Sequence, residues 1–66
     1  MKTVALTPEE ASFVIDRLGG TGEVADLCEV DPSAVSQWRR KGMPKHWVKF
    51  LRLARPSGFD GLAVPQ

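Results

Sequence analysis

Residues that begin or end helices recur about every dozen positions along this chain of 66 residues, which limits each helix to about three turns. Proline is favoured in the first turn of a helix, where its missing N–H group costs no hydrogen bond. Glycine is favoured just beyond the last turn, because it adopts left-handed backbone angles without strain. Start signals stand at Thr7-Pro8, Asp31-Pro32 and Pro44, and stop signals stand at Gly19-Gly20, Gly42 and Pro56. The chain is therefore predicted to have an all-α fold, a small domain of four to five short helices.

The apolar residues between these signals recur three and four positions apart, as they do along one face of an amphipathic helix. We expect helices over residues 8–18, 22–28, 32–41 and 44–55. Thr7 and Glu10 are expected to form a capping box on the first helix, and Thr21 is expected to cap the second. The residues predicted to face inward are Ala11, Val14, Ile15 and Leu18; Val24, Ala25 and Cys28; Ala34, Val35 and Trp38; and Trp47, Phe50, Leu51 and Ala54. The residues expected on the solvent-facing side of the last helix are Lys45, Lys49 and Arg52.

A domain of this size buries only about 60% of the surface that its unfolded chain exposes, so its core is marginal. Such folds often gain stability from a disulfide, a metal or a second subunit. Cys28 is the only cysteine and His46 the only histidine, so the sequence offers neither an intrachain disulfide nor a zinc pattern. We therefore expect no metal and no cofactor, and we infer by elimination that the chain forms a homodimer, either free or only on a partner.

The charged residues are divided unequally between the two halves of the chain. Residues 1–31 contain two basic and seven acidic residues, whereas residues 32–66 contain seven basic residues and one acidic residue. A positive face of this kind is typical of a protein that binds a polyanion. The alternative, which the charge alone leaves open, is a solvated basic surface balanced by the acidic half.

No stretch of the sequence approaches the roughly 20 consecutive apolar residues of a membrane-spanning helix. Residues 1–20 carry Glu9, Glu10 and Asp16 and lack the unbroken apolar run of a signal segment. A single thiol fits a reducing compartment. We expect a cytoplasmic protein without a membrane partner.

Residues 29–31 form a connection of only three residues between the second and third predicted helices. A tight turn of this kind is the requirement of a helix-turn-helix, because it holds the second helix at a steep angle with its outer face protruding. That face is predicted to carry hydrogen-bonding side chains of the lengths that reach base edges in the DNA major groove. These side chains are Ser33, Ser36, Gln37 and Arg40.

The segment from Thr21 to Arg40, TGEVADLCEVDPSAVSQWRR, resembles the helix-turn-helix of the phage Cro and repressor family. The longer segment LGGTGEVADLCEVDPSAVSQWRRKGMP, from Leu18 to Pro44, is similar in particular to the Cro-like and YdaS-like antitoxin branch. The apolar positions of the family motif are matched here by Val24, Ala25, Val30, Val35 and Trp38. Glu29 occupies a turn position at which the family usually has glycine, and a left-handed backbone there would cost about 1 kcal/mol.

This resemblance implies a lambda-repressor-like fold that binds palindromic operator DNA as a dimer, with the two recognition helices about 34 Å apart. The residues that it assigns to base contacts are Ser33, Ser36, Gln37 and Arg40. Gln37 suits adenine and Arg40 suits guanine, since each can form two hydrogen bonds with its base. Phosphate contacts are implied through the backbone N–H groups of Thr21 and Gly22 at a helix N-terminus. The side chains expected to contact phosphate are Arg39, Lys41 and Lys45.

Residues 1–56 are accordingly predicted to form a helix-turn-helix DNA-binding domain, and residues 57–66 a flexible or dimer-contacting tail with Phe59 and Leu62 as docking points. The expected function is that of a sequence-specific transcriptional regulator, a Cro-type repressor of phage or prophage origin. The alternative is an antitoxin-like protein-interaction module with secondary DNA binding, whose binding segment would be the apolar tail that includes Val64.

Two further classes of function receive less support. Residues 45–55 form a basic amphipathic helix that could bind a membrane surface. Packing of its apolar face on the other helices explains the pattern better, because their apolar faces must also be buried. The sequence contains no nucleophile–base pair, no set of metal ligands and no phosphate-binding loop. We therefore expect neither catalysis nor a small-molecule substrate.

Overall fold

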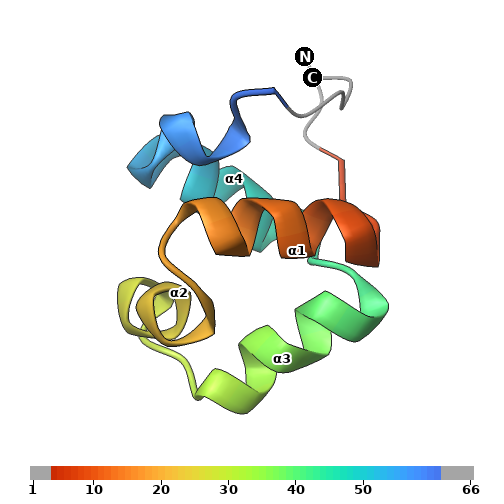
Figure 1. Ribbon diagram of the computed structural model, residues 1–66, viewed down its shortest axis with the longest axis vertical. Helices are drawn as coiled ribbons and strands as arrows, with labels where there is room; N and C mark the ends of the chain where they lie inside the picture. The colour runs from red at the N-terminus through yellow and green to blue at the C-terminus, as the bar shows by residue number, and fades with distance from the viewer. Residues whose placement is uncertain (1–3, 62–66) are drawn as a thin grey trace.

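The structure, a computed structural model, describes residues 4–61 and arranges them as short helices with tight connections (Figure 1). The elements are α1 (Pro8–Arg17), α2 (Thr21–Cys28), α3 (Pro32–Lys41), α4 (Lys45–Ala54) and the 3-10 helix η1 (Pro56–Phe59). The all-α fold predicted from the sequence is confirmed. Within the described residues, pairing of extended chain is limited to one antiparallel bridge between Leu6 and Met43.

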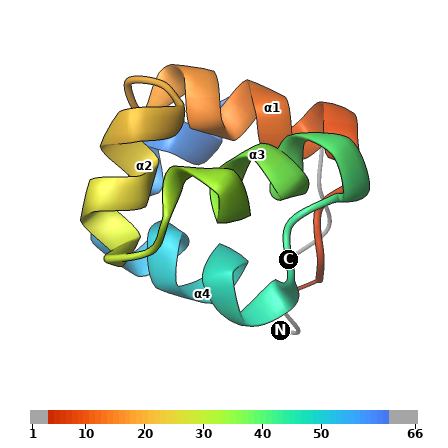
Figure 2. The ribbon, with the colours of Figure 1, turned by 90° about the horizontal axis from the view of Figure 1, so that it is seen from below.

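Helix α3 lies at the surface of the helical bundle, in front of the other helices (Figure 2). It packs against α1 and α2, whereas η1 packs against α4 and α1. In Figure 1, α1 crosses the molecule with α2 and α3 below it and α4 behind it. Figure 2, seen from below, shows α3 in front, between α1 and α4, with α2 to one side. One long face of α3 is therefore left uncovered by the other helices.

The core receives apolar side chains from every helix. Because residues advance by about 100° along a helix, those three and four apart fall on one side and meet the neighbouring helices. The buried residues of the four α-helices are Ala11, Val14, Ile15, Val24, Ala25, Cys28, Val35, Trp38, Val48 and Leu51, and Leu6, Met43 and Phe59 join them from the connecting segments. Among the described residues, no polar or charged residue is buried. The hydrophobic effect, at roughly 1.5–3 kcal/mol for each large side chain, is therefore the main stabilising term.

The helix starts follow the local chemistry predicted at α1 and α3. The N–H of Glu10 donates to Thr7 Oγ1 at 3.2 Å, and the N–H of Thr7 donates to Glu10 Oε1 at 2.9 Å, which completes the predicted capping box. Asp31 Oδ1 accepts the N–H of Ser33 at 2.9 Å. Hydrogen bonding from the backbone and then the side chain of Ser33 lowers the pKa of the Asp31 carboxyl.

The start of α2 differs from the prediction by one residue. Gly20 is the N-cap, and Thr21 is the first helical residue, so Thr21 does not cap the helix. No side chain caps this N-terminus. The Thr21 hydroxyl is used instead in a contact with α3.

The inward face of α4 also differs from the predicted one. Val48 and Leu51 are buried, whereas Phe50, expected in the core, is 41% exposed. Arg52, expected on the solvent-facing side, is partly buried, and its guanidinium carbon lies 4.4 Å from the centre of the Phe59 ring. The cause is η1, which packs on the Arg52 side of α4 and leaves the Phe50 side open.

Folded structure extends beyond the domain boundary predicted at residue 56. Helix η1 brings Phe59 into the core, where it is 6% exposed. A Cβ on Gly58 would stand 2.5 Å from Leu18 Cδ2, so glycine permits the close approach of η1 to α1. Residues 56–59 therefore pack against α1 and α4, with Phe59 as a docking point as expected. The predicted roles of Leu62 and Val64 lie outside the described residues.

Candidate nucleic-acid interface

Helices α2 and α3 are joined by three residues, as predicted, and backbone hydrogen bonds close the turn. The N–H of Val30 donates to the carbonyl of Ala25 at 3.0 Å, and the N–H of Glu29 donates to the carbonyl of Asp26 at 3.2 Å. Glu29 has φ 57° and ψ 44°, in the left-handed region. This is the Schellman arrangement, in which glycine is the usual left-handed residue. The turn therefore fits a helix-turn-helix, and Glu29 holds the strained position within it.

The outer face of α3 carries polar side chains that the other helices do not cover. Of the four residues predicted to contact bases, Ser33, Gln37 and Arg40 are exposed and Ser36 is partly exposed. Val35 and Trp38, on the opposite side of the helix, are buried. The structure thus places the four predicted base-contact residues on one side of α3.

Aromatic contacts with α4 support the buried side of α3. The ring centroid of Trp38 lies 5.5 Å from that of Trp47, and Trp47 packs edge-on against Phe50 with centroids 5.8 Å apart. Such aromatic pairs contribute about 0.5–1.5 kcal/mol beyond the burial of their surface. The prediction that Trp38 belongs to the core is confirmed, and its ring contact with Trp47 links α3 to α4.

The two lysines predicted to contact phosphate lie where α3 ends and α4 begins. Lys41 is the last residue of α3 and Lys45 the first of α4, and both are exposed. Figure 2 shows the N-termini of α2 and α4 on opposite sides of α3. The outer face of α3 is therefore flanked by lysines on one side and by the N-terminus of α2 on the other.

The N-terminus of α2 presents backbone N–H groups that the helix itself does not use. The first of its residues to donate to a helical carbonyl acceptor is Val24, whose N–H bonds to Gly20 at 3.1 Å. The N–H groups of Thr21 and Gly22 precede this bond, at the positive end of the helix dipole. Gly22 is exposed, and a Cβ built on it would meet no atom within 4 Å. This end of α2 is open to a ligand.

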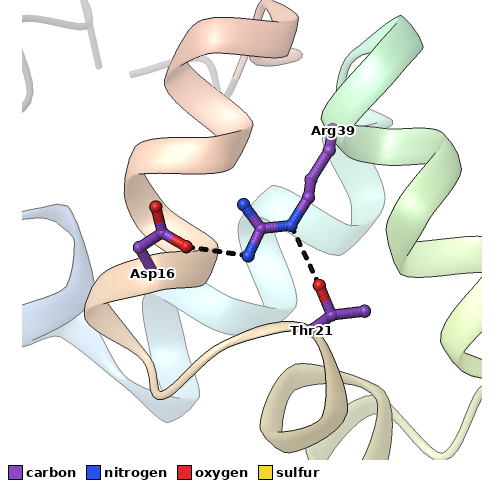
Figure 3. Close-up of polar contacts among 3 residues, drawn as sticks. All are labelled: Asp16, Thr21 and Arg39. Atoms are coloured by element: carbon purple, nitrogen blue, oxygen red, sulfur yellow. Dashed lines mark hydrogen bonds and ion pairs between the residues drawn. The ribbon is translucent and has the colours of Figure 1, made fainter.

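Arg39 joins three helices and is not a free side chain on the surface of α3 (Figure 3). Its Nε donates to Thr21 Oγ1 at 2.9 Å, and Nη2 donates to Asp16 Oδ1 at 2.8 Å. The side chain of Arg39 is 27% exposed and that of Asp16 is 69% exposed. Arg39 was predicted to contact phosphate, and in the structure its guanidinium is engaged within the protein.

Asp16 is the residue of this region that the sequence interpretation missed. In the sequence it is one of several acidic residues on the solvent-facing side of α1, 23 positions from Arg39. Only the packing of α3 against α1 brings the two side chains together. Arg17, the residue after Asp16, is directed elsewhere: its guanidinium carbon lies 5.5 Å from the centre of the Phe13 ring.

Three further features of residues 4–61 concern metal ligands, the single thiol and helix length. Among them, no three His, Cys, Asp or Glu side chains gather in a way that could hold a metal ion. Burial raises the pKa of the Cys28 thiol, which makes it a poor nucleophile. No helix in this range has the length and apolar character needed to span a membrane. Comparison of the chain with family models, with curated proteins and with solved structures gives no match.

Proposed function

We propose that this chain is a sequence-specific DNA-binding transcriptional regulator, a repressor of the Cro type, that inserts α3 into the major groove of operator DNA. The observation that carries the proposal is the outer face of α3, where Ser33, Gln37 and Arg40 are exposed together on a firmly packed helix. Helix α3 contains no acidic residue and ends in Arg39, Arg40 and Lys41. A protruding helix with this chemistry suits the negatively charged groove of DNA.

Sequence recognition in this proposal rests on side-chain contacts with base edges. Gln37 would form two hydrogen bonds with adenine, and Arg40 would form two with guanine, each worth about 1–3 kcal/mol of discrimination. Ser33 and Ser36 lie nearer the start of α3 and have shorter side chains, which suit closer approach to the bases. The N-terminal part of a recognition helix usually lies deepest in the groove.

Phosphate contacts on both sides of α3 would fix its register in the groove. The N–H groups of Thr21 and Gly22 are available on one side, and Lys41 and Lys45 are exposed on the other. A major groove about 12 Å wide has a phosphate backbone along each edge, so contacts on both flanks suit an inserted helix.

We further propose that two copies bind a palindromic operator, one on each half-site. The recognition helices would then lie one helical turn of DNA apart, about 34 Å. Repression would follow from occlusion of RNA polymerase without any chemical step, and the protein would act in the cytoplasm, at the nucleoid or on phage DNA.

The test is selection of the full chain on a pool of random DNA duplexes at two salt concentrations, followed by sequencing of the retained DNA. We expect enrichment of a palindrome whose half-site centres are about 10 base pairs apart. Affinity for the pool should also fall with salt, with a slope near −0.9 for each neutralised phosphate. Retention of DNA at low salt with no enriched sequence would overturn the proposal of sequence-specific binding.

A second candidate function is an antitoxin-like protein-interaction module that binds DNA only secondarily. The observation in its favour is the exposure of Phe50 and Leu53 on α4, at 41% and 77%. Two exposed apolar residues one helical turn apart are a small patch, and single exposed apolar residues are common on monomers. Salt-sensitive retention without enrichment would favour this candidate over the repressor.

A further inference from the structure

The guanidinium of Arg39 is held at the end of α2 that the proposed function assigns to a DNA phosphate. Its Nε is fixed by Thr21 Oγ1 at 2.9 Å, and the free N–H groups of Thr21 and Gly22 are on the same turn. A phosphate bound by those N–H groups would therefore lie beside a positively charged group. That group already has an anionic partner, the carboxylate of Asp16.

The geometry permits Arg39 to exchange one partner while it keeps the other. Thr21 binds Nε, Asp16 binds Nη2, and among the hydrogen bonds of the described residues none uses Nη1. Two of the three guanidinium nitrogens can thus turn to a phosphate without loss of the Thr21 contact. Asp16 is 69% exposed, so its carboxylate would return to water at little cost.

We propose that Asp16 is a competing anion that lowers the affinity of the α2–α3 unit for DNA by occupying Arg39 until a phosphate displaces it. This inference rests on the proposed function and adds a determinant of affinity that contacts neither base nor phosphate. Asp16 acts through Arg39, because the ion pair determines how much of the positive charge of Arg39 is available to DNA.

Two measurable effects follow from this competition. Because an exposed ion pair is worth at most about 1 kcal/mol, Asp16→Asn should tighten DNA binding by about two- to fivefold at low salt. In the wild type, the freed Asp16 carboxylate stays beside the bound phosphate and offsets the positive charge of Arg39. The variant brings that charge without the offset, so its plot of log affinity against log salt should be steeper, by up to about 0.9.

The experiment measures binding of the full chain to a mixed-sequence duplex of about 20 base pairs, since phosphate contacts need no operator. Four proteins form a double-mutant cycle: wild type, Asp16→Asn, Arg39→Gln and the double variant. Glu23→Gln is the matched control, because Glu23 is also an exposed acid near the N-terminus of α2, and no hydrogen bond of the described residues joins it to Arg39. Thermal unfolding of each variant shows that it is folded, and Asp16→Ala replaces Asp16→Asn if the latter is not.

We expect Asp16→Asn to tighten binding and steepen the salt dependence with Arg39 present, and to have no effect in the Arg39→Gln background. Equal tightening in both backgrounds, or with Glu23→Gln, would mean that only the overall charge matters and would overturn the inference. Unchanged or weaker binding by Asp16→Asn would overturn it as well and leave the proposed function intact. Failure of the wild type to bind any duplex would overturn both.

Discussion

The carbonyl oxygen of Leu6 lies 2.5 Å from the position that a Cβ on Gly42 would occupy. Gly42 has φ 103°, and the next residue, Met43, exchanges two backbone hydrogen bonds of 3.1 Å with Leu6. The close approach ties the N-terminal segment to the connection between α3 and α4. It thereby fixes the point at which α3 ends and the direction in which α4 leaves it.

Gly42→Ala should therefore destabilise the domain by about 2 kcal/mol or more, because it combines a strained backbone conformation with a clash against a backbone atom. The measurement is chemical denaturation followed by tryptophan fluorescence, since Trp38 and Trp47 both lie near this connection.

Gly20→Ala is the matched control for that variant. Gly20 has nearly the same φ, 105°, but a Cβ there would meet no atom within 4 Å, so only the backbone strain applies. If Gly20→Ala costs as much as Gly42→Ala, the contact with Leu6 is not a determinant of stability.

Glu29→Gly should stabilise the domain by about 0.5–1 kcal/mol. Glycine relieves the left-handed strain at φ 57°, and this gain is partly offset by the greater freedom of glycine in the unfolded chain. Glu29→Ala also removes the negative charge from the C-terminus of α2 but keeps the Cβ, so it should gain less. Denaturation midpoints compare the two variants, and equal stabilities would contradict the role assigned to backbone strain.

The cap of α3 should make stability depend on pH through Asp31. Hydrogen bonds from Ser33 hold the pKa of Asp31 below its ordinary value, so its contribution is complete above about pH 4 and is lost as the pH falls through the lowered value. Asp31→Asn still caps the helix but does not titrate. As the pH falls from about 6 to 2, the Tm of the wild type should therefore fall by more than the Tm of Asp31→Asn. A constant difference would show that the cap does not depend on the charge of Asp31.

Features set by neighbouring residues could be predicted from the sequence. The capping box of Thr7 and Glu10 and the cap at Asp31 need only a few consecutive residues, and both are present. The shared face of Ser33, Gln37 and Arg40 follows from helical periodicity once the helix start is known.

Features that depend on packing between distant segments could not be predicted. Phe59 is a docking point, as the sequence predicts, but the sequence does not give the surface on which it docks. The inward face of α4 is rotated because η1 folds onto it through Phe59. The Arg39 contact with Asp16 likewise arises only where α3 crosses α1. Sequence periodicity identifies which residues of a helix are apolar, but the position of the neighbouring element decides which of them are covered.

The most direct test of base recognition by α3 is the binding of Gln37→Ala to the enriched operator and to a scrambled duplex of the same length. Lys49→Ala, an exposed residue of α4, is the control. We predict that Gln37→Ala loses roughly 1–3 kcal/mol on the operator, loses discrimination at one position of each half-site, and binds the scrambled duplex as the wild type does. Equal losses on both duplexes, or no loss on the operator, would contradict the assignment of α3 as the recognition helix.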